Sequence, residues 1–382
     1  MTLVFERNVP GAATHACIIG CGRFKTYKPD GTADRPGTVA GARDMVRFLI
    51  QQRDELIAPL ATIHCVLSDP ANAVGQDMLG IGPHGNDPRP DDAVDAATTL
   101  LAKAAADAWA LRGQAGDTML FYMASHGFVD TDMTALGAFE DLGASQLRPF
   151  ENAINVTRLA IALPPHIMAA HCFVFLDACQ EMLEALFQQY GGAGALNLLH
   201  PSLQAFARTP VRSVALASSR VGQKAWAPPN GTAPYFTKAL LEGMATCCVE
   251  QVRDQGWVVT GNRLTNGVAS VADAALDYSG METEQLVPNN RPAHLMRVAN
   301  PMIPIAVRTV PEGHINFAQS VSADDGNGHV IPRTDNALTW KFRVPPSRAE
   351  YKAQALFPGM DPPSREGRFP ADAPAQIVEL RP

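Results

Sequence analysis

The sequence predicts an α/β protein with a mostly parallel sheet that carries helices on both faces. Two observations lead to this prediction. Short apolar runs typical of buried strands recur along the first two-thirds of the chain, and segments with helical spacing of apolar residues separate them. Parallel strands need long crossover connections, usually helices, so this alternation indicates repeated strand–helix–strand units. A chain of 382 residues, 46% hydrophobic and 18% charged, is long enough for a large buried core.

The expected elements alternate along the chain. A helix over 38–57 is indicated by apolar residues at helical spacing, and a helix over 91–112 begins on an acidic pair, which helix N-termini favour. Residues 69–90 are rich in Gly, Pro, Asn and Asp and therefore predict a loop. The expected strands cover 15–21, 61–67, 117–124, 172–177 and 212–218, and later helices cover 232–244 and 267–278.

The C-terminal part differs in composition, because 12 of the 30 prolines lie beyond residue 300. We therefore expect two parts, a main domain over 1–290 and a Pro-rich extension over 291–382. Proline interrupts helices and central strands, so the extension is expected to be irregular, short-stranded or partly disordered.

Charge and cysteine content exclude several classes of protein. A net charge of −7 argues against a nucleic-acid or membrane surface, which would need a basic patch. No apolar run approaches the roughly 20 residues that span a bilayer, and the N-terminus lacks the pattern of a signal peptide. Seven cysteines without zinc-type spacing predict neither a disulfide framework nor a metal site. We expect a cytoplasmic protein without a metal or other cofactor.

Two strand-like runs end in residues that can carry chemistry. The run over 118–127 ends in Ser-His-Gly and holds His126, and the run over 171–179 ends in Asp-Ala-Cys and holds Cys179, 53 residues later. The carboxyl ends of parallel strands meet at one edge of a sheet, so one crevice can hold both side chains. An imidazole beside a thiol makes it a competent nucleophile at neutral pH. The pair therefore predicts nucleophilic catalysis.

Each residue alone also has a plainer interpretation. A histidine at a strand end can be structural, and a buried cysteine is more often a small hydrophobic residue than a nucleophile. Cys179 differs from the cysteines inside the strand-like runs because the chain turns polar directly after it, which predicts a thiol at the rim. The amides of Gly127 and Cys179 are the expected donors to an oxyanion.

Four stretches within roughly 12–280 resemble the caspase-like cysteine proteases, which include caspases, metacaspases, paracaspases and bacterial relatives. They are the first strand with the segment 36–45, similar to the Gly-x-x-Asn-Asp segment of metacaspases; Ser-His-Gly at 125–127; Asp-Ala-Cys at 177–179; and the strand, loop and helix over 215–243. The sequence resembles a bacterial metacaspase-like member most. The resemblance implies a caspase-like three-layer sandwich for 1–290.

The resemblance also implies an activity. It implies a cysteine endopeptidase with a His–Cys dyad that cuts peptide bonds through an acyl-enzyme. Cys179 would attack the carbonyl carbon, and His126 would protonate the leaving amine and then activate water. The implied partners are a protein or peptide substrate and an upstream activating protease. For a bacterial relative, it suggests a role in cell death or defence.

The resemblance also implies a substrate specificity, which depends on two acidic residues. Metacaspases and paracaspases hold a P1 arginine or lysine with carboxylates, one of them two residues before the nucleophile, where this chain has Asp177. A second of these carboxylates corresponds to Asp44 in this chain. Two carboxylates around one slot favour a guanidinium, which they can pair bidentately. Cleavage after Arg or Lys is therefore expected, with Asp44 and Asp177 in the S1 pocket.

Two alternatives stay open. Arg35 lies in an Arg-Pro-Gly-Thr segment similar to the one in which caspases place a P1-binding arginine, and Arg43 replaces the Asn of metacaspases, so an acidic P1 residue is the first alternative. The second is a catalytically silent, caspase-like binding module. It rests on the unfamiliar Gln180-Glu181 after the nucleophile and on the long extension.

Activation is the last feature that the resemblance addresses. The loop after the nucleophile is often cut in the family, which makes Arg208 and Arg212 candidate self-cleavage points. Some metacaspases need calcium. The segment 324–329 is rich in oxygen ligands but lacks the full calcium-loop pattern, so it is only a weak candidate.

Overall fold

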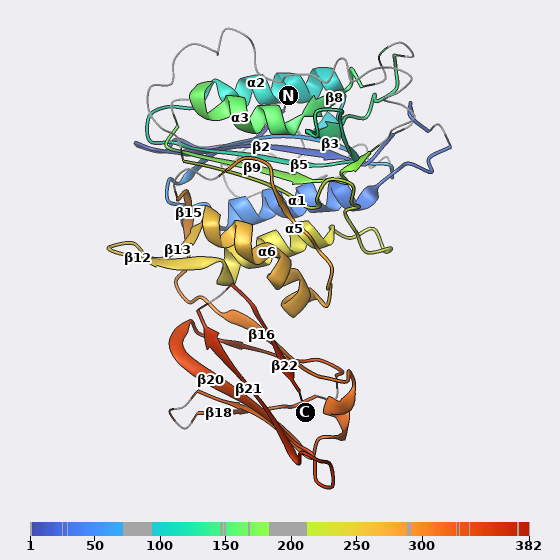
Figure 1. The fold of residues 1–382 in the computed structure, drawn as a ribbon. Coiled ribbons are helices and arrows are strands. Elements are labelled where there is room, and N and C mark those ends of the chain that lie inside the picture. Colours follow the sequence, from blue (N-terminus) through green and yellow to red (C-terminus); the bar gives the residue numbers. More distant parts are fainter. Residues whose placement is uncertain are drawn as a thin grey trace.

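The fold is described from a computed structural model of the chain. It describes residues 2–381 except 25, 29, 72–93, 146–147, 149, 167–168, 183–211, 289–291, 326, 328, 336 and 373. Within these residues a central sheet lies between two layers of helices, and a β-rich unit follows at the C-terminal end (Figure 1).

The central sheet confirms the predicted mostly parallel arrangement. Its order is β1-β3-β2-β5-β9-β11-β14, and β4 extends it beside β3. The inner neighbours pair in parallel, whereas the edge strands β1 and β14 pair antiparallel. The strands are β1 (Leu3–Glu6), β2 (Thr14–Cys21), β3 (Leu60–Ser68), β4 (Val94–Asp95), β5 (Thr118–Ala124), β9 (His171–Asp177), β11 (Arg212–Ala217) and β14 (Glu284–Gln285).

Helices cover both faces of this sheet (Figure 1). The helices α2 (Thr99–Ala110) and α3 (Val156–His166) lie on one face. The helices α1 (Pro36–Gln51), α5 (Tyr235–Glu242) and α6 (Gly261–Leu276) lie on the other, and a short π-helix, η3 (Gly243–Cys247), continues α5.

The alternation of side chains along β2 explains its unbroken apolar sequence. Ala16 and Ile18 belong to the core on the α1 side, and Cys17 and Ile19 belong to the core on the α2 side. In a strand buried on both faces, the side chains on either face contact a core and are therefore apolar. The sequence of such a strand is a continuous apolar run rather than an alternating one.

A small second sheet follows the end of β5. Its order is β10-β6-β7-β8, formed by β6 (Gly127–Val129), β7 (Ala135–Ala138), β8 (Ala153–Asn155) and β10 (Glu181–Met182). β10 follows β9 in the chain and pairs in parallel with β6, which follows β5. The chain segments just after β5 and β9 are therefore held together a second time, beyond the central sheet.

Among the helices, two predicted ranges need correction, and one helix was not predicted. The helix expected over 91–112 begins only at Thr99, because β4 occupies 94–95 and Thr98 caps the helix with its side chain. The helix expected over 38–57 runs from Pro36 to Gln51 instead. The helix α3 was not expected, since a Pro-Pro pair near its end weakens a helical pattern.

The extension consists of short strands, one of the conformations expected for it. A three-stranded sheet has the order β19-β16-β22 and a four-stranded sheet the order β18-β17-β20-β21. Their bounds are β16 (Ile303–Thr309), β17 (Ser320–Asp324), β18 (Val330–Pro332), β19 (Trp340–Val344), β20 (Ser347–Leu356), β21 (Ser364–Ala371) and β22 (Gln376–Leu380), with a 3₁₀ turn, η4 (His314–Phe317). The strands β12 (Val249–Val252), β13 (Gly256–Thr260) and β15 (His294–Arg297) form a separate sheet, so β15 joins the preceding part of the chain.

The extension packs on α6 and η3 through β16 and β22 (Figure 1). Arg308 of β16 forms an ion pair with Asp273 of α6, and both side chains are less than a quarter exposed. Pro374 lies so close to Gly267 of α6 that a β-carbon there would clash with it. The two parts share one continuous apolar core.

Candidate active site

The register of β5 and β9 brings His126 and Cys179 to the same edge of the sheet. Ala124 lies opposite Asp177, and the amide of Ser125 donates to the Asp177 carbonyl at 3.1 Å. His126 and Cys179 each follow two residues after this aligned pair. The predicted nucleophile and its predicted base are therefore neighbours on adjacent strand ends.

A close backbone approach ties the two strand ends together at Gly127. A β-carbon at this position would clash with the carbonyl oxygen of Cys179 and lie 2.6 Å from the β-carbon of Ala178. Only glycine lets the segment after His126 pass the nucleophile at this distance. The two predicted oxyanion donors, Gly127 and Cys179, consequently lie side by side.

The imidazole of His126 is oriented by a backbone carbonyl. Its Nε2 lies 2.7 Å from the carbonyl oxygen of Ala33, and the ring packs edge-on against Phe24 at a centroid distance of 4.6 Å. A carbonyl can only accept, so Nε2 carries the proton. In the neutral ring this leaves Nδ1 as the basic nitrogen. Burial lowers the pKa of His126, which favours that neutral form.

Cys179 is the half-buried member of the seven cysteines, and the other six are buried. Its thiol lies 3.8 Å from the carbonyl oxygen of Ala225, the range of a weak S–H hydrogen bond. Burial raises the pKa of Cys179, and the carboxylates of Glu181 and Asp177 raise it further. At neutral pH the shifts therefore favour a neutral thiol at Cys179 and a neutral imidazole at His126.

Gln180 and Glu181, the two residues after Cys179, contact the segment 219–224 that follows β11. The amide of Gln180 donates to Gln223 at 2.9 Å, its carbonyl accepts from Gly222 at 2.7 Å, and its side chain donates to Ser219. Glu181 pairs with Lys224 at 3.4 Å across half-exposed side chains. These contacts hold the segment whose next residue, Ala225, accepts from the Cys179 thiol.

Asp177 is buried, with 2% of its surface exposed. Its carboxylate accepts from the amide of Thr237 at 3.2 Å and from the hydroxyl of Thr237. Burial raises the pKa of this carboxyl to about 6. The predicted S1 role of Asp177 stays a prediction, and one oxygen of the carboxylate, Oδ2, binds Thr237 of α5.

The other predicted specificity residues lie on or beside α1. Asp44 pairs with Arg47 at 3.1 Å on the helix surface, and Arg43 pairs with Asp69 at 2.7 Å. Arg35 donates to the carbonyl of Asp34 at 2.9 Å, and its charge lowers the pKa of both His126 and Cys179. Among these residues, Arg35 is the one whose charge reaches both members of the pair.

The remaining predicted positions are placed as follows. Arg208 lies outside the described residues. Arg212 is the first residue of β11, where its amide donates to Ala170, so it lies inside the sheet rather than in a linker. In the segment 324–329, the Asp325 carboxylate accepts from the amides of Asn327 and His329 and so closes a turn. The described part of the chain holds no cluster of three or more His, Cys, Asp or Glu side chains suited to a metal ion.

One residue beside the site was not singled out from the sequence. Trp226 follows Ala225, the acceptor of the Cys179 thiol, and is 59% exposed. Large exposed indoles are unusual and often mark contact surfaces. The signal in the sequence was a tryptophan within a polar loop after the fifth strand.

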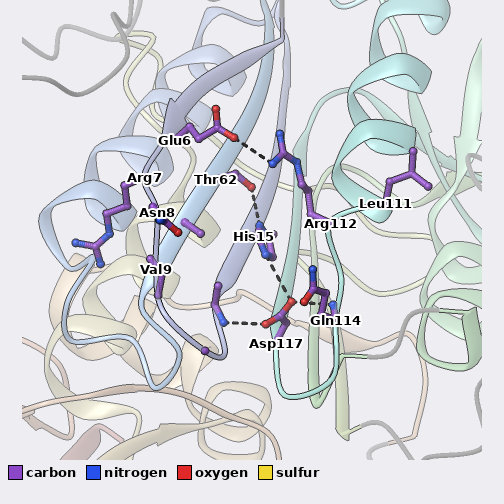
Figure 2. Close-up of a pocket in the computed structure, with 13 residues that line it drawn as sticks. Glu6, Arg7, Asn8, Val9, His15, Thr62, Leu111, Arg112, Gln114 and Asp117 are labelled. Carbon is purple, nitrogen blue, oxygen red and sulfur yellow. Dashed lines mark hydrogen bonds and ion pairs between the residues drawn. The ribbon is translucent and has the colours of Figure 1, made fainter.

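A pocket lies at the opposite edge of the sheet, at the amino ends of β2, β3 and β5 (Figure 2). Its volume is about 430 Å³. His15 lies between Thr62, at 2.8 Å, and Asp117, at 3.6 Å, while Glu6 pairs with Arg112 at 3.0 Å (Figure 2). These polar groups pair with one another, and no predicted site residue lines the pocket.

Comparisons of the chain with known proteins were made by family and by individual relatives. No family model matches it. It is 25% identical over 213 residues to the uncharacterized protein y4kE of Sinorhizobium fredii, an alignment that covers 54% of this chain and 59% of that relative. The chain thus spans less than two-thirds of the length of this relative.

Two solved structures are similar to this chain. Caspase-1 from Spodoptera frugiperda matches with a TM-score of 0.39 and 15% identity, over 77% of this chain and 92% of that one. Protein GSU0716 from Geobacter sulfurreducens matches with a TM-score of 0.37 and 14% identity, over 60% and 80%. At such scores, the α/β assignment rests on the sheet order and helix layers described above.

One further finding concerns membranes. Among the described residues, no helix is both long and apolar enough to span a bilayer.

Proposed function

We propose that this chain is a cysteine endopeptidase in which Cys179 is the nucleophile and His126 the general base and acid. The observation that carries the proposal is the strand register. It aligns Ala124 with Asp177 and so sets the two residues at neighbouring strand ends, with Gly127 against the Cys179 carbonyl. A thiol, an imidazole and two backbone amides are the groups that acyl transfer needs.

The proposed reaction begins from the neutral pair. Nδ1 of His126 takes the thiol proton as Sγ attacks the carbonyl carbon of the scissile bond, and the amides of Gly127 and Cys179 stabilise the oxyanion. The imidazolium then protonates the leaving amine, which gives an acyl-enzyme. A water molecule, deprotonated by the same Nδ1, hydrolyses the thioester and restores the thiol. The Ala33 carbonyl keeps Nδ1 as the working nitrogen throughout.

Specificity for arginine or lysine at P1 is part of this proposal. It depends on Asp44 or Asp177 reaching the substrate cation. For Asp44 this means competing with its surface partner Arg47, and for Asp177 it means binding a carboxylate whose Oδ2 already accepts from Thr237. An acidic P1 residue is the second candidate. It is supported by Arg35, whose charge acts on both His126 and Cys179.

Proteolytic activation is proposed on the same family grounds. Cleavage after Arg208 fits a segment between β10 and β11, whereas cleavage after Arg212 would require β11 to open at its first residue. Calcium dependence is a weaker proposal. It is tested by adding calcium or a chelator to the assays below.

The experiment is P1 profiling of the purified chain with fluorogenic peptides that carry Arg, Lys, Asp or a neutral residue at P1. Cys179→Ala should abolish cleavage, and His126→Ala should lower kcat by about 10²–10⁴-fold because proton transfer is lost. Asp54→Asn, on an exposed surface pair, is the matched control. Cleavage only after Asp would replace the basic P1 assignment with the Arg35 candidate.

Labelling separates an enzyme from a silent binding module. An arginine chloromethylketone should alkylate the wild-type chain once and leave Cys179→Ala unmodified. If the wild-type thiol stays unlabelled after limited proteolysis and with calcium, the endopeptidase proposal fails.

A further inference from the structure

The carboxylate of Asp177 joins the nucleophile strand to the start of α5. Thr237 is the third residue of α5, and both its amide and its hydroxyl donate to Asp177. The helix has no side-chain cap of its own, because Pro234 precedes it. A carboxylate at a helix N-terminus satisfies amides without an intrahelical partner and opposes the positive end of the helix dipole. Asp177 therefore caps α5 from 60 residues upstream.

The same point is connected to β5 and β11. The hydroxyl of Tyr122 in β5 lies 2.5 Å from the hydroxyl of Thr237. Ser218, directly after β11, contacts the Asp177 carboxylate and accepts the amide proton of Ala178 at 2.9 Å. The two residues immediately before Cys179 are thus held from α5, β5 and β11.

We propose that Asp177 is a positioning residue, which fixes Cys179 through Thr237 and Ser218 rather than binding the P1 side chain. Its carboxylate is buried, and the amide and hydroxyl of Thr237 both donate to the same oxygen, Oδ2. A substrate cation at Oδ2 would compete with both Thr237 donors and so weaken the cap of α5. This inference rests on the proposed function and makes it more specific, because the P1 preference then depends on other residues.

The main test compares two substitutions at Thr237. Thr237→Ser keeps the hydroxyl donor, whereas Thr237→Val keeps the shape and removes it. We expect Thr237→Ser to retain kcat and Thr237→Val to lower kcat by about 10- to 100-fold, the effect of a small misplacement of the nucleophile. The ratios of kcat/KM among Arg, Lys, Asp and neutral P1 substrates should stay as in wild type.

Asp177→Asn provides the second comparison. We expect a loss in kcat with unchanged P1 ratios. A selective loss on Arg and Lys substrates, with kcat retained on others, would overturn the proposal and assign Asp177 to the S1 pocket. Wild-type kcat in both Thr237→Val and Asp177→Asn would overturn it as well.

A readout independent of peptide cleavage separates this inference from the proposed function. The rate of Cys179 alkylation by iodoacetamide is measured by mass spectrometry in wild type, Thr237→Ser and Thr237→Val. We expect at least a threefold faster rate only in Thr237→Val, because the thiol is released from its position. Equal rates in all three contradict the positioning role even if no peptide is cleaved. The six buried cysteines should stay unlabelled, which verifies that each variant is folded.

Discussion

At the scale of single residues, burial sets the protonation states of the proposed catalytic pair, His126 and Cys179. It lowers the pKa of His126 and raises that of Cys179, so both changes oppose a preformed thiolate–imidazolium pair. The proposed enzyme therefore relies on general-base transfer during attack. This distinguishes it from thiol enzymes that hold a stable ion pair.

The first residue-scale prediction concerns pH. Alkylation of Cys179 by iodoacetamide should be slow at pH 7 and rise only as the thiol ionises above its ordinary pKa. Peptide cleavage, in contrast, should persist below pH 6.5, because the lowered pKa keeps His126 neutral there. If the wild type is alkylated rapidly at pH 6 and the His126→Ala variant is not, the two residues form an ion pair before substrate binds. That result would contradict this prediction.

The second residue-scale prediction concerns the contribution of Asp177 to the stability of the fold. Its pKa of about 6 in the folded state lies above the unfolded value, so the folded chain binds this proton more tightly. The contribution of Asp177 to the free energy of unfolding is fully present below the pKa of this carboxyl in the unfolded chain. It is lost as the pH rises through about 6, the pKa in the folded state. Relative to Asp177→Asn, the wild type should lose on the order of 1–3 kcal/mol between pH 4 and pH 7. Urea denaturation of both proteins at several pH values measures this difference, and a flat difference contradicts the assigned shift.

At the scale of elements, the sequence was most informative where a strand is buried on both faces. The bounds of β5 and β9 were predicted nearly to the residue, because short continuous apolar runs are typical of strands buried on both faces. The helix α2 was misplaced because the acidic pair before it suggested a start, whereas Thr98 supplies the cap. The strands of the extension were obscured by its prolines, several of which lie at strand edges and turns.

The same contrast holds for the candidate site. Motif and spacing identified His126 and Cys179 from local sequence. The partner of Asp177 could not be found in this way, because Thr237 lies 60 residues further along the chain on a different element. The Ala33 carbonyl, in turn, belongs to a loop with no distinctive sequence. Long-range contacts of this kind depend on the packing of whole elements.

At the scale of the whole molecule, the extension is part of the main core. The Arg308–Asp273 pair lies between the two parts, and both partners are largely shielded from water. Lys341 and Arg343 add pairs to Asp277 and Glu242 at the same junction. The extension therefore supports the helices on whose other side the central sheet lies, with the candidate residues His126 and Cys179 at its edge.

This arrangement predicts a stability effect. Arg308→Ala should lower the free energy of unfolding by about 1–3 kcal/mol, because Asp273 loses its partner while still shielded from water. Arg381→Ala, from an exposed pair with Glu379, should change it by less than about 0.5 kcal/mol. Urea denaturation of the two variants gives the comparison. Equal effects would mean that the junction contributes no more than a surface pair.

The register of β5 and β9 also constrains how this chain can change its length. Ala124 and Asp177 lie opposite each other, and the two functional residues follow at equal offsets. Side chains alternate between faces along a strand, so one residue inserted into β5 would turn His126 to the face away from Cys179. An insertion of two residues would restore the face but move the imidazole past the thiol along the strand. The proposed catalysis would therefore constrain the number of residues in each strand, separately from which residues these are.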